Sequence, residues 1–324
     1  MPKDLVLGFD IGGTSTRALL ATLDGKHVGA AQGPGGNPTS HGLEASLTAI
    51  ENAAREAIGG ADATRIRAVH LGMAGGQPYE DPANRARLST VWTRLRVDAH
   101  VTVDTDLTVA FAAATPAPSG TVAIGGTGAI AAAVGDRRLT RRADGYGWLL
   151  GDEGSGFWLG RQAVRTALKV LDGRLPSGPL AEAVIAAAWT RAGRPDIREL
   201  IDVIAHRPPL ELAGYARLVT TAAEAGDERA VALLDEAAGL LSETIASVRE
   251  AGAETPIVLG GSLLTGGTRV GAGVRARLAE LFPTAPVHTA RDGAAGAAWL
   301  AAAEYIEDPA GVHHAFTGGA NETA

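Results

Sequence analysis

A short glycine-rich turn that follows an apolar strand occurs twice in the chain, and this repetition constrains the fold more than any other feature. The first turn is Asp10-Ile11-Gly12-Gly13-Thr14, and it follows the apolar run Leu5–Phe9. The second is Gly125-Gly126-Thr127-Gly128, and it follows Thr121–Ile124. Each turn is followed by another strand-like run, which indicates a hairpin. The repetition predicts two lobes that begin in the same way.

The remaining periodicity extends each hairpin into an α/β lobe. The first half continues with strand-like and helical segments at 16–23, 27–32, 43–58, 68–71 and 101–103. The second half has short strands at 129–134, 257–259 and 287–289, and helical patterns at 161–171, 180–190, 197–205, 210–224 and 229–250. A further apolar helix is expected at 293–305. Together these segments predict a duplicated β-β-β-α-β-α unit.

The length of the chain agrees with two lobes, because 324 residues exceed one ordinary hydrophobic core. With 46% hydrophobic and 20% charged residues the composition is that of a globular protein. We expect an N-terminal lobe of residues 1–115 together with the closing helix at 293–305. A C-terminal lobe is expected at 116–292, and a mobile polar tail at 306–324.

Composition also excludes several functions. The chain contains no cysteine, which rules out disulfides, thiolate zinc sites and cysteine-ligated iron–sulfur clusters. A net charge of −7 with 4% aromatic residues argues against a nucleic-acid surface. The N-terminus lacks the pattern of a secretion signal and no apolar run is long enough for a membrane span, so a cytoplasmic location is expected. The number of subunits stays open, with a homodimer as one alternative.

Five blocks, in order, resemble the motifs of the actin-like ATPase superfamily of sugar kinases and chaperones. Residues 9–14 and 124–128 are similar to the two phosphate motifs, and residues 105–110 to the first connecting segment. Residues 258–262 are similar to the adenosine motif, and residues 293–298 to the second connecting helix. The segments Gly35–Pro38 and Gly147–Ser155 more narrowly resemble the N-acetylglucosamine kinase branch, with its actinobacterial glucosamine kinases, of the BadF/BcrA-type ATPase family. This resemblance implies an α/β fold of two actin-like (ribonuclease H-like) lobes, each a βββαβαβα unit, with an ATP cleft between them.

The chemistry of the two turns suits a nucleotide. Glycines let backbone N–H groups approach phosphates, and Thr14 adds a hydroxyl donor. No Walker-type lysine follows, so neither turn is a P-loop. Asp10 is the candidate Mg²⁺ ligand, through water; the alternative is that this segment is only a tight hairpin. The resemblance implies ATP and Mg²⁺ as cofactors, with ATP contacts from Gly12, Gly13, Thr14, Thr16, Arg17, Gly126, Thr127, Gly128, Gly260, Gly261 and Ser262.

Phosphoryl transfer also needs a carboxylate that takes the proton of the attacking hydroxyl. Asp106 is the candidate base, because it follows a strand at the edge where open α/β sheets expose their ligand-binding residues. Asp104 is kept as a sugar ligand or an alternative base. A helix N-cap remains the structural alternative for Asp106.

The sugar contacts are implied mainly by the resemblance. It places Asn37, Thr105, Gly151, Asp152 and Glu153 near the sugar, with Asp104 and Asp106. A plain Asn-Pro turn and an acidic helix N-terminus are the alternatives for these loops. The density of acids would suit a free ammonium, so phosphorylation of D-glucosamine to glucosamine 6-phosphate is favoured. N-acetylglucosamine, another hexose, or an ATP-binding sugar sensor without turnover are the alternatives.

Overall fold

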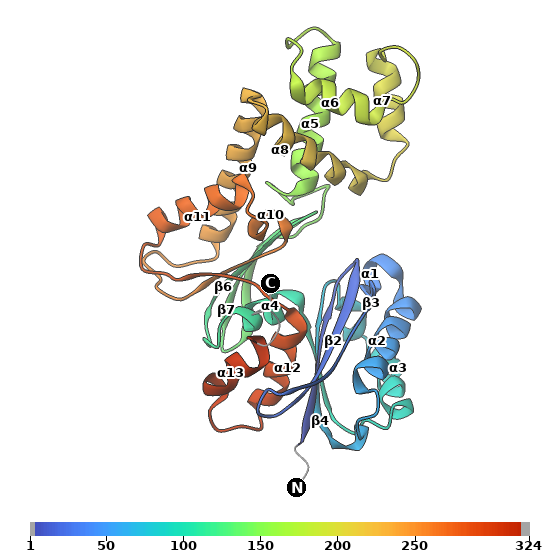
Figure 1. The fold of residues 1–324 in the computed structure, drawn as a ribbon, viewed down its shortest axis with the longest axis vertical. Coiled ribbons are helices and arrows are strands. Elements are labelled where there is room, and N and C mark those ends of the chain that lie inside the picture. The colour runs from blue at the N-terminus through green and yellow to red at the C-terminus, as the bar shows by residue number, and fades with distance from the viewer. Residues whose placement is uncertain (1–3, 319–324) are drawn as a thin grey trace. The chain divides into compact units, whose positions relative to one another are not determined.

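The computed structural model describes residues 4–318, which fall into two compact units (Figure 1). The first unit contains the chain up to Val122, the short segment Val134–Leu139 and the chain from His288 onward. The second unit contains Ala123–Ala133 and Thr140–Val287. Residues 116–122, 134–139 and 288–292 therefore group with the first unit, whereas the sequence analysis expected them in the second lobe. Within residues 4–318, no helix combines the length and the apolarity that crossing a bilayer requires.

A five-stranded sheet in the order β3-β2-β1-β4-β5 forms the centre of the first unit. Its strands are β1 (Leu5–Ile11), β2 (Ser15–Thr22), β3 (His27–Pro34), β4 (Ile66–Met73) and β5 (His100–Thr105). The first three strands pair antiparallel, as expected for a meander, and β4 and β5 continue the sheet parallel to β1. The strand β1 is buried on both faces because it lies in the middle, which explains its nearly continuous apolar sequence.

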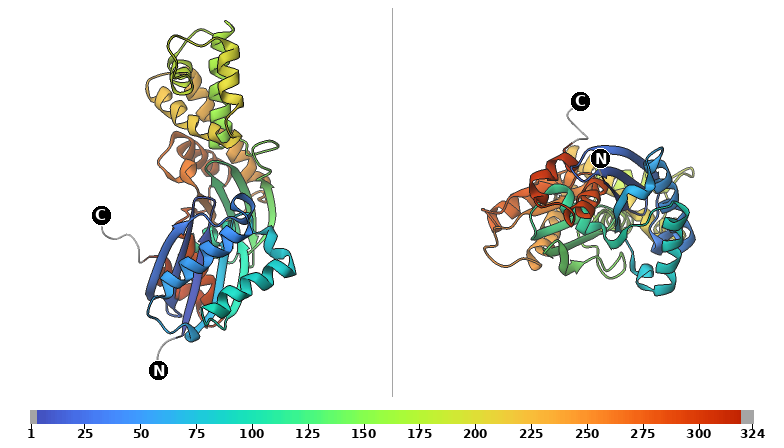
Figure 2. Two further views of the ribbon diagram at one scale, coloured as in Figure 1. Left: turned by 90° about the vertical axis from the view of Figure 1, so that its right-hand side faces the viewer. Right: turned by 90° about the horizontal axis from the view of Figure 1, so that it is seen from below.

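Helices cover both faces of this sheet. The helices α2 (Leu43–Ile58) and α3 (Pro82–Arg94) pack on one face, and α4 (Asp106–Ala114), α12 (Gly293–Ala303) and α13 (Pro309–Thr317) pack on the other (Figure 2). The short elements α1 (Pro38–His41), η1 (Ala63–Arg65) and η2 (Gln77–Glu80) complete the unit. The helix α12 lies directly on β1 at Gly8, where an added Cβ would come within 2.1 Å of the Ala298 nitrogen.

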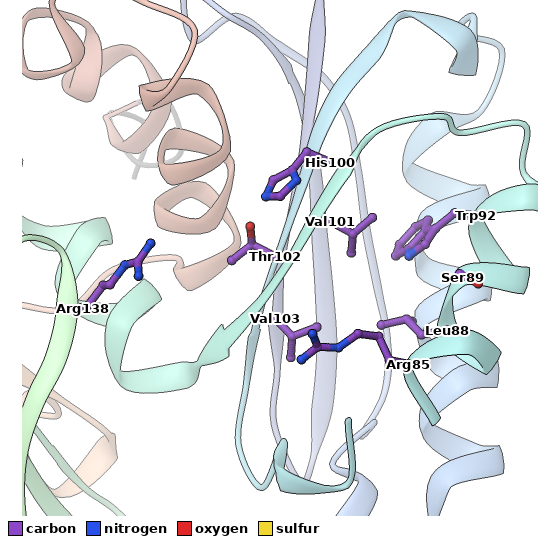
Figure 3. A pocket seen from close by; sticks show the side chains of 9 residues that line it. All are labelled: Arg85, Leu88, Ser89, Trp92, His100, Val101, Thr102, Val103 and Arg138. Carbon is purple, nitrogen blue, oxygen red and sulfur yellow. The ribbon is translucent and has the colours of Figure 1, made fainter. Parts of the chain in front are cut away.

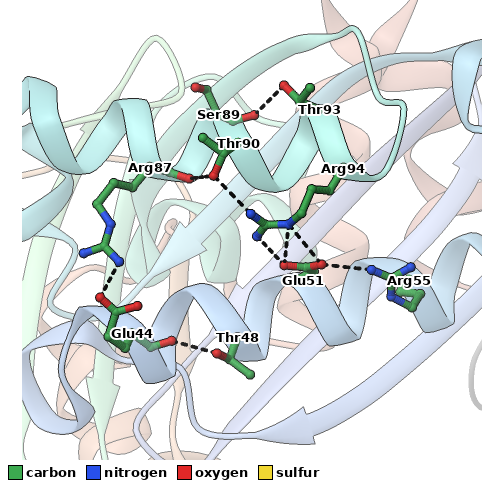
Figure 4. A network of polar contacts seen from close by, with 9 residues as sticks. All are labelled: Glu44, Thr48, Glu51, Arg55, Arg87, Ser89, Thr90, Thr93 and Arg94. Atoms are coloured by element: carbon green, nitrogen blue, oxygen red, sulfur yellow. Dashed lines mark hydrogen bonds and ion pairs between the residues drawn. The ribbon is translucent and has the colours of Figure 1, made fainter.

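An ion-pair network connects the exposed sides of α2 and α3 (Figure 4). Glu51 pairs with Arg55 on its own helix and with Arg94 on α3, while Arg87 pairs with Glu44. The bond from Arg94 is the largest cause of the lowered pKa of Glu51. Exposed pairs of this kind contribute up to about 1 kcal/mol each, so the apolar core beneath them dominates the packing.

The second unit is built on a sheet in the order β10-β9-β6-β7-β8. Its strands are β6 (Gly120–Gly125), β7 (Ala129–Gly135), β8 (Arg138–Asp144), β9 (Ile257–Gly260) and β10 (Val287–Thr289). Its helices are α5 (Gly156–Leu171), α6 (Pro179–Ala188), α7 (Ile197–Ala205), α8 (Ala216–Glu224), α9 (Glu228–Ser247), α10 (Ser262–Thr265) and α11 (Arg269–Leu281), with η3 at Pro209–Tyr215. The two sheets match the fold expected from the duplicated turns.

The C-terminal segment differs from the mobile tail expected at 306–324. Pro309–Thr317 forms α13, and Phe316 is fully buried. His313 is also buried and its Nε2 lies 2.7 Å from the carbonyl oxygen of Ala112. These tertiary contacts stabilise a helix whose nine residues are too few to be stable alone. Residues 319–324 of the expected tail lie outside the described part of the chain.

Candidate active site

The predicted acids lie at the carboxyl edge of the parallel strands of the first unit. Asp10 on β1 is in register with Gly72 on β4, and Gly72 is in register with Asp104 on β5. Residues in register on parallel strands project to the same face, so both carboxylates lie on the face that α4 and α12 cover. Asp106 opens α4 immediately after β5.

The first glycine turn is braced by a neighbouring loop. The Gly12 nitrogen donates to the Ser15 carbonyl at 2.9 Å, which closes the hairpin. The backbone nitrogens of Gly36 and Asn37 donate to the Gly12 carbonyl at 3.1 and 3.2 Å. The His41 Nε2 lies 2.7 Å from the Gly13 carbonyl. The carbonyls are therefore tied to this loop while Gly13 itself stays exposed, as a phosphate-binding turn requires.

The sequence analysis overlooked His41, which holds the turn without belonging to it. The sequence alone does not indicate this role, because a single histidine in a short helix can be structural, solvent-exposed or functional. The structure also separates Thr14 from Thr16: Thr14 is exposed, whereas Thr16 is fully buried and its Oγ1 has no hydrogen-bond partner among the described residues. Thr16 is therefore placed behind the turn. Arg17 is exposed beside it.

Asp10 is a carboxylate under electrostatic strain. The pKa of Asp10 is raised to about 6, chiefly by burial; Arg17 lowers it, and the carboxylates of Asp106 and Asp292 add smaller upward contributions. The Arg17 guanidinium lies 3.9 Å from Asp10 Oδ2. The start of α12 presses against the same side chain, since a Cβ on Gly293 would lie 2.8 Å from Asp10 Cγ. A cation bound here would relieve this repulsion.

The donor set decides how such a cation could be held. Within residues 4–318, no group of three or more His, Cys, Asp or Glu side chains is arranged to hold a metal ion. Magnesium usually binds one or two carboxylates and keeps several waters and phosphate oxygens. Asp10 fits that mode. Asp292, the N-cap of α12, is a nearby acid that was not among the residues predicted from the sequence.

Asp104 and Asp106 have different surroundings. Asp104 Oδ1 accepts hydrogen bonds from the Thr105 nitrogen at 2.7 Å and from Thr108 Oγ1 at 2.9 Å. Asp106 Oδ1 accepts from the nitrogen of the adjacent Leu107 at 3.0 Å, and burial raises the pKa of Asp106. The role of helix N-cap belongs to Thr105, whose hydroxyl accepts from the Thr108 nitrogen. Asp106 is therefore the less constrained acid of the two.

Asn37 acts as a cap as well as a candidate sugar ligand. Its Oδ1 accepts from the nitrogens of Thr39 and Ser40 at 2.8 and 3.2 Å, which starts α1. The alternative of an Asn-Pro turn is thus present in the structure. The other group of the amide, Nδ2, is the one left to donate to a hydroxyl.

The second glycine turn repeats the closure of the first. The Gly126 nitrogen donates to the Gly128 carbonyl at 2.9 Å. The start of α5 then binds the turn, because the nitrogens of Gly156 and Phe157 donate to the carbonyls of Gly126 and Thr127 at 2.8 and 3.0 Å. Thr127 remains exposed at the tip. Both turns thus have bound carbonyls and an exposed tip.

Asp152 is held beside this turn by a strained backbone. Its φ of 57° lies in the left-handed region, which costs about 1–3 kcal/mol for a residue with a side chain. Asp152 Oδ1 accepts from the Ala129 nitrogen at 3.1 Å, and burial raises its pKa. The Asp144 carboxylate accepts hydrogen bonds from the backbone nitrogens of Asp152 and Glu153 at 2.7 and 2.9 Å. Glu153 itself lies 3.8 Å from Arg161.

Asp144 is the second residue that the sequence analysis overlooked. It orients Asp152 and Glu153, and it requires glycine at position 151, where a Cβ would come within 2.1 Å of Asp144 Oδ1. Gly151 is therefore buried support for the acidic loop. In the sequence, Asp144 followed by Gly145 and Gly147 indicates a turn, but not which backbone nitrogens its carboxylate binds.

The adenosine motif lies against the second glycine turn. Gly261 has a φ of 80°, and a Cβ on it would lie 2.4 Å from the Gly125 carbonyl oxygen. Ser262 then begins α10 and is exposed. The end of β9, including Gly260, is thus fixed to the end of β6 by backbone contact, so the two motifs of the second unit form one surface.

A family model matches this chain over residues 7–301. The chain belongs to the BadF/BadG/BcrA/BcrD ATPase family. An N-acetylmuramic acid/N-acetylglucosamine kinase of Clostridium acetobutylicum is 28% identical over 251 residues, 76% of this chain and 79% of the relative. A glucosamine kinase of Vibrio cholerae is 25% identical over 261 residues, 78% and 83% of the two chains.

A solved structure shares the fold of this chain. It is a proposed N-acetylglucosamine kinase from Chromobacterium violaceum, with 26% identity, a TM-score of 0.70, and coverage of 92% of this chain and 99% of the other. For this member of the ATPase family, the fold places the candidate residues in two sets. The first unit contains Asp10, Gly12, Gly13, Thr14, Thr16, Arg17, Asn37, Asp104, Thr105 and Asp106. The second unit contains Gly126, Thr127, Gly128, Gly151, Asp152, Glu153, Gly260, Gly261 and Ser262.

Proposed function

We propose that this chain transfers the γ-phosphoryl group of Mg-ATP to a hydroxyl of an amino sugar. Support comes from the family of ATPases, from relatives named as amino-sugar kinases, and from two glycine turns whose carbonyls are bound and whose tips are exposed. The observation that carries the proposal is the difference between Asp104 and Asp106 at the carboxyl edge of the first sheet.

In the proposed reaction, Asp106 accepts the proton of the sugar hydroxyl while the hydroxyl oxygen forms a bond to the γ-phosphorus and ADP leaves. A base must be free to bind the proton. The Asp106 carboxylate accepts a hydrogen bond from the adjacent backbone and none from another side chain among the described residues. Its raised pKa also brings it closer to the operating pH. Asp104, bound to Thr108, orients the start of α4 instead.

The other residues position the two substrates. The exposed turns at Gly12–Thr14 and Gly126–Gly128 supply hydrogen-bond donors for phosphates, and Gly261 and Ser262 shape the surface for the nucleoside. Asp10 would hold the magnesium of Mg-ATP, which would supply positive charge beside the phosphates. Asn37 and Asp152 bind sugar hydroxyls. Phosphoryl transfer requires this positioning more than covalent chemistry.

D-Glucosamine, giving glucosamine 6-phosphate, is our first candidate for the acceptor. Asp152 is the acid we assign to an ammonium, because Asp104 is bound to Thr108, Glu153 lies near Arg161, and only Oδ1 of Asp152 accepts a backbone hydrogen bond. N-acetylglucosamine is the second candidate. The exposed apolar side chains of Tyr146, Trp148, Leu149 and Leu150, which precede Asp152, would suit an acetyl group.

The experiment compares Asp106→Asn with Asp104→Asn in an ADP-release assay with glucosamine and with N-acetylglucosamine. We expect Asp106→Asn to lower kcat by at least about 100-fold while the Kd for ATP stays within about twofold. Asp104→Asn should retain measurable turnover. If Asp104→Asn abolishes turnover and Asp106→Asn does not, the roles are reversed. Sugar binding without any turnover in the unaltered protein would instead indicate a sensor.

A further inference from the structure

The first unit contains a polar cavity that no step of the proposed reaction uses. It has a volume of about 610 Å³, within the range of roughly 300–1,000 Å³ that is typical of small-molecule sites. It follows β5 on the side of α12, and Figure 3 shows that His100 and Thr102 point to this side while Val101 and Val103 point toward α3.

Two buried polar groups in this cavity lack partners. His70 on β4 is 8% exposed, and its Nε2 has no hydrogen-bond partner among the described residues. Asp104 Oδ2 is 3.9 Å from that nitrogen, beyond hydrogen-bond distance. Arg137 Nε is likewise buried and without a partner. Buried polar groups in folded proteins nearly always have partners, so at these two atoms the wall of the cavity has hydrogen-bonding capacity that the described residues leave unused.

The Arg137 guanidinium is held in place by its surroundings. It stacks over the Trp299 ring at 5.1 Å, and that ring packs edge-on against His313 at 4.9 Å. Its backbone φ of 60° is in the left-handed region, which a side chain of this size rarely adopts. A strained turn therefore presents a fixed guanidinium, and Arg138 follows it at the cavity wall.

The charges of the lining define the chemistry of the ligand. The two adjacent arginines suit a phosphate, which guanidinium groups bind with two parallel hydrogen bonds. Burial lowers the pKa of His70 to about 4, so its imidazole is neutral and suits a hydroxyl. The acids Asp104, Asp136 and Glu304 also line the cavity, and their carboxylates can accept hydrogen bonds from hydroxyl groups. A phosphate and several hydroxyls in one small molecule satisfy both sets.

We propose that this cavity binds a hexose phosphate, with the phosphate on Arg137 and Arg138 and the sugar hydroxyls toward His70 and Glu304. The cavity reaches Asp104 and Thr105, the two residues that precede the proposed base Asp106. A ligand there contacts the residues that fix the start of α4, so its binding lowers turnover from outside the reacting groups. This effect on turnover rests on the proposed function; the binding itself does not.

Calorimetric titration with glucose 6-phosphate tests the binding, because this ester is not the product of an amino-sugar kinase. We expect it to bind the unaltered protein, and to bind Arg138→Gln at least tenfold more weakly. Arg141→Gln is the matched control, since Arg141 lies on the same strand, is exposed and does not line the cavity. That control should bind as tightly as the unaltered protein. A His70→Phe variant, which removes the unpartnered nitrogen, should also bind at least tenfold more weakly.

Three results would overturn the proposal: no binding of glucose 6-phosphate, equal affinity in all variants, or displacement of the ligand by saturating amino sugar. Equally tight binding of inorganic phosphate would overturn the assignment to a sugar ester. Binding is measured without turnover, so the two proposals can fail separately. If the unaltered protein binds glucose 6-phosphate but has no kinase activity, and Arg138→Gln weakens that binding, the proposed function is refuted and this site still stands.

Discussion

Three aspartates at one edge of a sheet differ in what surrounds them. The sequence predicted the positions of Asp10, Asp104 and Asp106, because each ends a strand or begins a helix there. It could not assign their roles, since these depend on partners far along the chain. His70 lies 34 residues before Asp104 in the sequence, and Asp292 affects Asp10 from the other end of the chain. Electrostatic neighbours of this kind become visible only in the folded unit.

The raised pKa of Asp10 predicts how stability depends on pH. Its value is about 6 in the folded chain and 3.8 in a model compound, so the folded state binds more protons between these pH values. Stability from this group is therefore lost as the pH rises from about 4 to about 6. We expect Asp10→Asn to be more stable than the unaltered protein at pH 8, by about 1–3 kcal/mol, since one pKa unit corresponds to about 1.4 kcal/mol.

Chemical denaturation at pH 8 and at pH 4 measures this difference. At pH 4 the advantage of Asp10→Asn should shrink toward zero, because the aspartate is then protonated in the folded protein. The same variant should turn over poorly if Asp10 holds the magnesium of Mg-ATP. Equal stability of the two proteins at pH 8 would show that Asp10 is not strained.

Elements with local signals were predicted well, and elements that depend on distant contacts were not. The helix expected at 197–205 is confirmed at both ends, and its N-terminus has a local signal, because Asp196 and Glu199 form a capping box. The helix expected at 210–224 is instead divided into η3 and α8. The helix α13 was missed, since its burial depends on Phe316 and His313 packing against elements far along the chain.

Phe316 tests how much α13 contributes to the first unit. It is fully buried, so Phe316→Ala should lower the free energy of unfolding by about 3–5 kcal/mol. His314→Ala on the same helix is the control, because His314 is exposed and should change stability by less than about 0.5 kcal/mol. Thermal and chemical denaturation measure both. Similar small effects for the two variants would mean that α13 does not stabilise the unit.

Gly261 tests the contact between β9 and β6 in the second unit. Both Gly261 and Gly267 have a positive φ, but only at Gly261 would a Cβ meet backbone, whereas at Gly267 nothing lies within 4 Å. We expect Gly267→Ala to lose about 1–2 kcal/mol from its backbone conformation alone. Gly261→Ala should lose clearly more and should weaken binding of an ATP analogue at least tenfold. Equal losses in the two variants would exclude a steric role.

For the whole molecule, repetition in the sequence was the most informative signal. Two glycine turns after apolar strands predicted two sheets, and each sheet has its own core. The division into units was harder to place. Residues 134–139 form the end of β7, the turn and the start of β8, yet they group with the first unit, where Arg137 stacks on Trp299. A single side-chain contact of this kind leaves no periodic pattern in the sequence.

A coupled assay of ADP release, with the sugar varied and Mg-ATP fixed, decides whether the molecule is an amino-sugar kinase. We expect release of one ADP for each molecule of glucosamine or N-acetylglucosamine phosphorylated, with little release without sugar. Glucose and mannose should be poorer acceptors. ADP release that is independent of every sugar, or absent with all of them while ATP still binds, would contradict the proposed reaction.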